Sequence, residues 1–335
     1  MRRRARLGLA TLVCAAVAAV ALRAQGGTHA APDPSQVNAK GRAAMLAYFH
    51  DDPFSPLRAF RRYDFPPAGG AASGGAGGTA GPAAVIGSSA EADVRLEGPG
   101  VEPRALRMVV MAPEGAGQPA RFRLERLAPE GDLRVSGAPW TAAAADTRVV
   151  PEETRVEIGP FALRPYVQAD AGILILFDSR RTAGAAFVPP AWFDFDRAWV
   201  FRARLAPDPK PTPVTMLTSL GRTKEYLRVG SFTLDVPGRR ALKVVAYRPT
   251  FIANAAARLS ILFTDATTGK ETYGAGRYLD LEPPADGVYT IDFNRAYNPL
   301  CAYTNVYNCP IPPRENGLPV AIRAGEKTYP GHAAH

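Results

Sequence analysis

The chain has 335 residues and a formal net charge of +9, and 47% of its residues are hydrophobic. That length fits about two domains of ~150 residues each, and the hydrophobic fraction excludes a chain that is disordered overall. Only 3 Cys are present, which excludes a disulfide-dense scaffold.

Residues 1–24 have the order of a secretory signal peptide. Arginines at positions 2, 3, 4 and 6 precede an uncharged apolar run from Leu7 to Leu22, and Ala24 ends a small-residue cleavage site. We therefore expect an exported protein, periplasmic or secreted, with no stable membrane span after cleavage. An uncleaved anchor is the alternative, but the run is shorter than the ~20 apolar residues that cross a bilayer. The segment carries five arginines and no acidic residue, so its removal lowers the net charge from +9 to +4, too mild a balance to indicate nucleic-acid binding.

Residues 25–65 are expected to be a short helical lead. Ser35 can cap the helix, and Asp52 should end it because the residue before Pro53 avoids the helical region. Residues 66–84 are almost entirely Pro, Gly, Ala, Ser and Thr, which predicts a flexible linker.

Residues 85–180 contain short apolar runs between Gly and Pro turns, typical of a β-sandwich. We expect strands over 94–96, 106–111, 121–126, 155–158, 161–167 and 173–177, the fifth weakened by Pro165. The stretch from Ile86 to Leu96 resembles the opening of a forkhead-associated domain, a family that reads phosphothreonine. Ser88 stands where that family has an arginine and no Ser-x-x-His follows, so the resemblance implies a sandwich shape without phosphopeptide binding.

Residues 181–327 continue the strand pattern as an antiparallel C-terminal β domain, followed by a tail over 328–335. The expected strands are 198–205, 215–218, 227–235, 241–247, 259–263, 272–281 and 288–294. Alternation places Arg277 in an apolar row of its strand, where a guanidinium requires a partner. The nearest acidic residues in sequence are Asp265, Glu271 and Asp292. The fold class predicted is thus mainly β: a signal segment and short helical lead, then a forkhead-associated-like β-sandwich packed with a C-terminal antiparallel β domain.

The last quarter of the chain carries a dense series of polar motifs. They are Thr272-Tyr273-Gly274-Ala275-Gly276-Arg277-Tyr278-Leu279, Asp292-Phe293-Asn294, Tyr297-Asn298-Pro299, Cys301-Ala302-Tyr303, Cys309-Pro310, Pro312-Pro313, Glu315-Asn316 and Ala324-Gly325-Glu326. Over about residues 258–327 this series resembles the bacterial "domain of unknown function 1684" family. The resemblance implies a fold and a set of positions but no established activity. Family members often have an arginine after the Glu-Asn pair, where this chain has Gly317.

Cysteine and histidine positions limit the chemistry. Cys301 and Cys309 are expected to form a disulfide in an exported chain, and a zinc site with His332 and His335 is the weaker alternative. The only other histidines are His29 and His50, so a Ser-His-Asp triad would have to recruit His50. Neither a metal nor a cofactor is indicated.

The candidate binding residues are polar side chains of the same series: Asp265, Glu271, Tyr273, Arg277, Asp292, Asn294, Tyr297, Asn298, Tyr303, Glu315, Asn316 and Glu326. The first hypothesis is a non-catalytic envelope or ligand-binding protein in which Arg277 holds a small polar or anionic ligand. The second is a hydrolase acting on carbohydrate or envelope material, which requires two carboxyl groups roughly 5–10 Å apart in one cleft. A third is that these groups only tie an irregular loop to the β core.

Overall fold

The computed structural model describes residues 33–66, 81–111, 120–141, 146–168, 171–183, 187–250 and 258–331. The expected signal segment, most of the expected linker, His29, His332 and His335 lie outside the described residues.

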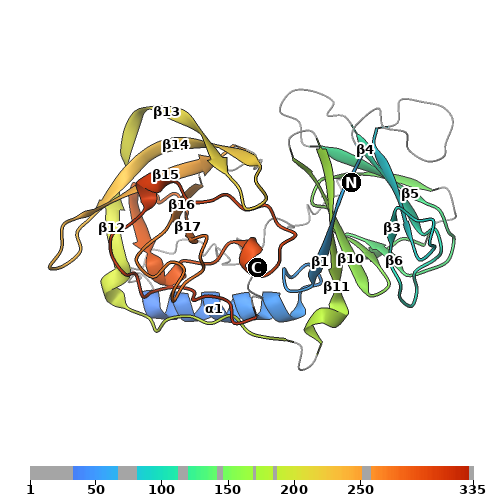
Figure 1. Cartoon of the computed structure of the whole chain (residues 1–335), viewed down its shortest axis with the longest axis horizontal. Coiled ribbons are helices and arrows are strands. Elements are labelled where there is room, and N and C mark those ends of the chain that lie inside the picture. The colour runs from blue at the N-terminus through green and yellow to red at the C-terminus, as the bar shows by residue number, and fades with distance from the viewer. Residues whose placement is uncertain are drawn as a thin grey trace, which may run out of the picture.

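The structure is mainly β, as predicted, with a β-sandwich beside a C-terminal β body. A helix lies along the C-terminal body and its end reaches the sandwich (Figure 1). The helix is α1 (Pro34–Asp51). Asp33 caps it, since its carboxylate accepts from the backbone N–H of Ser35 at 3.1 Å, and Pro34 occupies the first turn, where a missing N–H costs nothing. The helix ends before Pro53, as the sequence predicts, although the cap is Asp33 and not Ser35. Among the described residues, no helix combines the length and hydropathy needed to cross a membrane.

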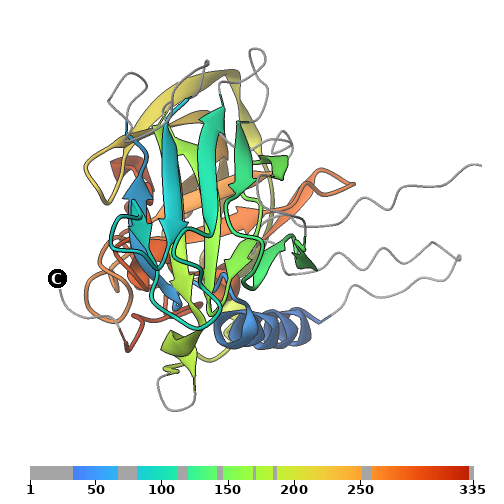
Figure 2. The ribbon, with the colours of Figure 1, turned by 90° about the vertical axis from the view of Figure 1, so that its right-hand side faces the viewer.

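Two antiparallel sheets form the sandwich, which faces the viewer in Figure 2. One contains β1 (Ala59–Asp64), β6 (Leu133–Val135), β7 (Ala138–Pro139), β9 (Val156–Ile158), β10 (Phe161–Gln168) and β11 (Ala171–Asp178). The other contains β2 (Ala83–Gly87), β3 (Val94–Arg95), β4 (Leu106–Met111), β5 (Arg121–Arg126) and β8 (Thr147–Pro151), in which only β2 and β3 pair in parallel. Alternate residues of both sheets, such as Leu124 and Leu176, fill one shared core around the buried Trp140.

Three expectations for this half are wrong. Residues 59–64 belong to no helical lead: they form strand β1, which pairs with β11. Strand β2 begins at Ala83, inside the expected linker. Pro165 does not weaken its strand, because β9 pairs with β10 only over 161–163 and has ended before Pro165 would need to donate to it.

The C-terminal body is built on a five-stranded antiparallel sheet with the order β13-β14-β15-β16-β17. Its strands are β13 (Ala206–Leu217), β14 (Thr223–Leu234), β15 (Leu242–Pro249), β16 (Leu259–Phe263) and β17 (Arg277–Leu281). A separate pair, β12 (Val200–Arg204) and β18 (Val288–Asp292), covers one face. The expected strand over 272–281 begins only at Arg277, because residues 265–272 form a turn and Gly276 has a φ of +85° that breaks the extended run.

Short 3-10 helices lie next to some of the strands and along the C-terminal loop, which comprises residues 293–331. They are η1 (Ser179–Thr182), η3 (Arg197–Trp199), η5 (Phe293–Arg295), η6 (Leu300–Ala302) and η7 (Arg314–Asn316). The loop crosses to the sandwich, where Val306 packs with Phe54 and Phe177 on the outer face of the β10–β11 pair. The loop that carries most candidate residues therefore also contacts the other half of the molecule.

Candidate functional site

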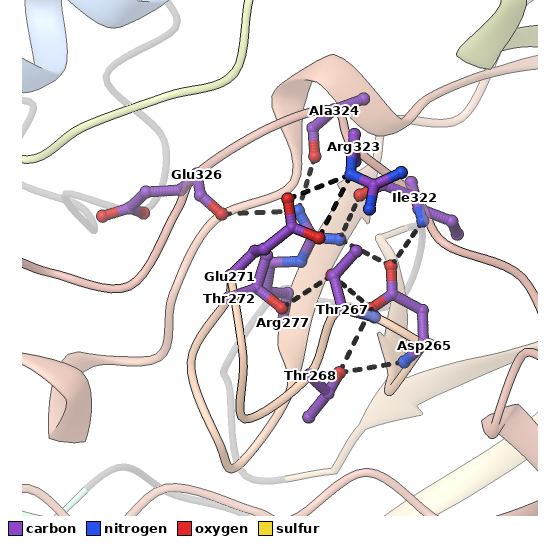
Figure 3. Close-up of polar contacts among 10 residues, drawn as sticks. All are labelled: Asp265, Thr267, Thr268, Glu271, Thr272, Arg277, Ile322, Arg323, Ala324 and Glu326. Carbon is purple, nitrogen blue, oxygen red and sulfur yellow. Dashed lines mark hydrogen bonds and ion pairs between the residues drawn. The ribbon is translucent and has the colours of Figure 1, made fainter.

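The Arg277 guanidinium is enclosed by protein (Figure 3). Its Nη2 donates to Asp265 Oδ2 and to the Ile322 carbonyl, both at 2.9 Å, and its Nη1 donates to the carbonyls of Ala324 and Glu326. Only 1% of Arg277 is exposed. The alternation correctly places this residue in an apolar row, and Asp265 is the partner among the acidic candidates.

Both carboxylate oxygens of Asp265 also accept hydrogen bonds. Its carboxylate accepts from the Thr267 backbone and hydroxyl at 3.0 and 2.6 Å, from the Thr268 hydroxyl at 3.2 Å and from the Ile322 N–H at 2.9 Å. A buried ion pair is tolerated when further hydrogen bonds support both ions. Here such bonds engage both oxygens of Asp265 and both Nη atoms of Arg277, and Arg277 Nε has no partner. The pair joins the 265–272 turn, β17 and the C-terminal loop, so the structure gives Arg277 an architectural role in place of the expected ligand contact.

Glu326 lies next to this pair and is fully buried. It accepts hydrogen bonds from the Asn298 N–H at 2.8 Å and from the Tyr303 hydroxyl. Burial raises the pKa of Glu326 to about 7, because the loss of hydration outweighs those bonds and the nearby positive charge of Arg277. The Asn298 amide donates to the Lys327 carbonyl at 2.7 Å.

Asn316 lies in a gap between β15 and β16, which pair directly only at Tyr247 and Ser260. Its amide replaces the missing ladder: Oδ1 accepts from the Val245 N–H, and Nδ2 donates to the carbonyls of Val245 and Leu262. Asn316 is therefore structural.

Two further acidic candidates lie apart at the surface. Glu315 accepts from the Tyr247 hydroxyl and from Arg228. Glu271 forms an exposed ion pair with Arg323 at 2.9 Å.

Asn294 contacts helix α1, and two further candidates, Asp292 and Tyr297, lie near it. Asp292 caps η5 by accepting from the Asn294 N–H at 2.9 Å, and burial raises the pKa of Asp292. The Asn294 carbonyl accepts from the Asn38 amide of α1 at 2.8 Å. Tyr297 donates to Asp280 at 2.8 Å. The structure thus brings Asn294 and Tyr297 to the junction between the helix and the C-terminal body.

A pocket of about 110 Å³ lies at this junction. One face of α1 lines it with Val37, Asn38, Gly41, Arg42 and Met45. The C-terminal body and the segment before η3 contribute the other lining residues, Trp192, Arg258, Leu279, Asp280, Glu282, Asn294, Arg295, Ala296 and Tyr297. The spacing of the helical residues repeats every three to four positions, as expected for one helix face.

Arg42 brings two unused donors to this pocket. Its Nε and Nη2 atoms are buried and have no hydrogen-bond partner in the structure. The guanidinium carbon lies 5.8 Å from the centre of the Trp192 ring, and the carboxylates of Asp194 and Asp292 act on it only through their charge. Desolvation lowers the pKa of Arg42, although a guanidinium stays charged in proteins. Arg258, by contrast, is held by Glu282 at 3.2 Å.

The acidic candidate residues do not line this pocket. Its acidic lining residues are Asp280 and Glu282, and none of Asp265, Glu271, Asp292, Glu315 and Glu326 lines it. Within the described ranges, no three His, Cys, Asp or Glu side chains gather as metal ligands would.

The expected disulfide is not formed in the structure. Cys301 and Cys309 are buried free thiols, and the Cys301 N–H donates to Cys309 Sγ at 3.3 Å. The Tyr273 hydroxyl, another candidate residue, lies 3.7 Å from Cys301 Sγ. The sequence correctly predicts that the two cysteines are neighbours, but the geometry recorded is a hydrogen bond and not a covalent bond.

Sequence reasoning missed the pocket residues Asn38, Arg42, Trp192 and Arg258, because they come from segments that are distant along the chain. The available signal was the spacing of Asn38 and Arg42, which places two polar side chains four positions apart on one helix face beside Gly41.

Comparisons with known proteins agree with the C-terminal motifs. The family model described as "Protein of unknown function (DUF1684)" matches residues 185–327. An uncharacterized protein of Haloarcula marismortui, solved by NMR, is 37% identical over 44% of this chain and 80% of its own length, with a TM-score of 0.36. No curated protein matches the chain significantly.

Solved forkhead-associated domains are also similar in structure to parts of the chain. The MEK1 FHA domain in complex with a phosphothreonine peptide of HOP1 is 9% identical over 29% of this chain and 79% of its own length, with a TM-score of 0.20. The FhaA FHA domain, complexed with an intracellular domain of another protein, is 20% identical over 31% of this chain and 89% of its own, with a TM-score of 0.18. The family itself is set by the C-terminal match: residues 185–327 belong to the DUF1684 family of proteins of unknown function.

Proposed function

We propose that this protein binds a small anionic ligand, without catalysis, in the pocket between α1 and the C-terminal β body. The observation that carries the proposal is Arg42, whose Nε and Nη2 are buried at the pocket without hydrogen-bond partners. An unpaired buried donor on a charged group costs free energy, and a ligand oxygen that accepts from it removes that cost.

The lining supports an anion with an apolar or flat body. Arg42, Arg258 and Arg295 outnumber the acidic lining residues Asp280 and Glu282, and Arg258 is neutralised by its own ion pairs. That leaves the Arg42 donors for a carboxylate or phosphate oxygen, with Trp192 beside them. The volume is below the ~150 Å³ of a cavity that holds benzene, so the part of the ligand inside the pocket is smaller than benzene, such as a single carboxylate or phosphate group.

A binding measurement tests the proposal. Isothermal titration calorimetry with malonate, succinate and inorganic phosphate is compared for the parent chain, Arg42→Gln and Arg202→Gln. Glutamine is a good helix former, so the first change removes the charged donors and preserves α1. Arg202 is a matched control, since it is 61% exposed, pairs with Asp286 and does not line the pocket.

We expect at least one anion to bind and Arg42→Gln to weaken it about tenfold or more, because hydrogen bonds to charged groups contribute ~1.5–3 kcal/mol. The Arg202→Gln variant should bind as the parent does. Equal affinities for both variants, or no binding by any of the three anions, would contradict the proposal.

We also propose that the protein is exported, on the basis of the arginine cluster and apolar run of residues 1–24. Cell fractionation with N-terminal sequencing of the recovered protein tests it. Recovery in the periplasm or medium with a new N-terminus near residue 25 is expected, whereas an uncut chain in the cytosol would refute export.

The hydrolase hypothesis receives no support from the geometry. The candidate carboxylates are each engaged in separate structural contacts and none of them faces the pocket.

A further inference from the structure

The Cys301–Cys309 pair forms a second polar cluster, apart from the anion pocket. Cys301 belongs to η6, and Cys309 lies where the C-terminal loop returns to the end of β13. Neither thiol is used by the proposed ligand site, and neither lines its pocket.

The surroundings of Cys301 stabilise a thiolate. The Tyr273 hydroxyl lies 3.7 Å from its Sγ and bonds its carbonyl at 3.3 Å. Hydrogen bonds from the Cys309 thiol, Tyr273 and Ser219 lower the pKa of Cys301 to about 7 against the opposing effect of burial. The same hydrogen bond between the two cysteine side chains raises the pKa of Cys309. The pair therefore shares one proton, and the negative charge resides on Cys301.

A half-buried cation acts on the pair through its charge. Lys224 of β14 interacts through its charge with both cysteines, and burial lowers the pKa of its ammonium group. A positive charge and several donors around one thiol are the conditions that make a cysteine nucleophilic. A structural thiol in an apolar core lacks them.

Access to the pair restricts its reaction partner. Cys301 and Cys309 are 5% and 8% exposed, which leaves an approach for a small oxidant and hinders a bulky disulfide. We propose that Cys301 and Cys309 form a peroxide-reactive dithiol, in which Cys301 is the nucleophile and Cys309 resolves its oxidised form to a disulfide.

The chemistry balances with hydrogen peroxide as the oxidant. The Cys301 thiolate attacks one peroxide oxygen, so that an S–O bond forms, the O–O bond breaks and hydroxide leaves and takes up a proton. Cys309 then attacks the sulfenic sulfur of Cys301, an S–S bond forms, the S–O bond breaks and water leaves. Two thiols are oxidised to a disulfide and peroxide is reduced to water.

Oxidation would act on the contact between the two halves of the molecule. The loop between the cysteines carries Val306, which packs on the sandwich, and Thr304, whose hydroxyl donates to the Ala59 carbonyl at 3.4 Å. Closing this loop covalently would restrict the segment that bridges the two bodies.

Mass spectrometry of the full chain tests the proposal directly. Reduced, folded protein is treated with hydrogen peroxide or with oxidised glutathione, alkylated and digested with trypsin. Cleavage after Arg295 and Arg314 places both cysteines in one peptide, separate from Cys14. We expect that peptide to lose two hydrogens with peroxide about tenfold faster than with oxidised glutathione.

Variants assign the roles. In Cys309→Ser we expect a sulfenic acid at Cys301 that dimedone traps, whereas in Cys301→Ser the remaining thiol should react about tenfold more slowly. Tyr273→Phe removes one donor and retains the ring, so it should slow the reaction about threefold while thermal melting stays close to that of the parent. Oxidation of the parent peptide only after unfolding, or equal rates in the two serine variants, would overturn the proposal. If a variant fails to fold, the measurement on the parent chain still tests the proposal.

Discussion

Glu326 makes a measurable prediction about stability and pH. Its pKa is about 7 in the folded chain against 4.5 for an ordinary glutamate. The folded state therefore holds the proton more tightly than the unfolded state does. Its stabilising contribution is fully present below pH 4.5 and is lost as pH rises through about 7. At ~1.4 kcal/mol per pKa unit, the full loss is about 3 kcal/mol.

Glu326→Gln isolates this effect. The glutamine amide resembles the protonated carboxyl. Its oxygen can accept from the Asn298 N–H, and its NH₂ group can donate to the Tyr303 hydroxyl oxygen, as a protonated carboxyl would. Urea unfolding followed by tryptophan fluorescence, from pH 4.5 to above 7, should give nearly equal free energies of unfolding at the acid end. The parent should become less stable than Glu326→Gln by up to about 3 kcal/mol at the alkaline end.

Glu271→Gln is the control for this experiment. Glu271 is exposed, and its hydrogen bonds and ion pair with Arg323 lower its pKa, so its contribution is lost as pH falls. It cannot reproduce a difference that grows with rising pH. If the gap between the parent and Glu326→Gln stayed constant over the whole range, the account of Glu326 as a buried, proton-holding carboxyl would be wrong.

Three further changes test the packing of the C-terminal body, each by urea unfolding. Asn316→Ala leaves two carbonyls and one N–H of β15 and β16 without their partner, so we expect a loss of about 3 kcal/mol; a loss near zero would show that the strands close without it. Asp265→Ala leaves the Arg277 charge buried and should cost ~3–5 kcal/mol, whereas the double variant with Arg277→Met should recover part of that loss; a double variant less stable than Asp265→Ala would refute the ion-pair interpretation. Gly276→Ala should cost at least ~1 kcal/mol, because φ is +85° and the added Cβ would lie 2.6 Å from the Phe263 carbonyl oxygen; an unchanged midpoint would contradict this.

Local patterns predicted the fold well where one face of an element is buried. Strand β17 follows the expected alternation, with Arg277, Leu279 and Leu281 all buried. The same pattern correctly indicated that Arg277 needed a partner. The alternation of apolar and polar residues does not indicate which strands become neighbours. The role of residues 59–64 as the edge strand beside β11 therefore could not be predicted.

The candidate site was only partly predictable for a physical reason. Polar density in the C-terminal loop signals hydrogen-bonded groups, but satisfied and unsatisfied groups look identical in sequence. Asp265 turned out to be engaged by Arg277, threonine and backbone groups, and Asn316 by backbone groups of β15 and β16. The unused donors that support the proposed anion site belong to Arg42. Their environment arises only when α1 packs on residues some 250 positions later, as in the contact from Asn38 to Asn294.

Above all, we propose that Arg42 holds the anionic group of a ligand at the α1 junction. A crystal of the full chain soaked with the tightest-binding anion of the calorimetric series tests it most directly. We expect carboxylate or phosphate oxygens within hydrogen-bond distance of Arg42 Nε and Nη2, beside Trp192. The same soak of Arg42→Gln should leave the pocket without the anion. An anion bound elsewhere in the parent crystal, with those two nitrogens still unpaired, would contradict it.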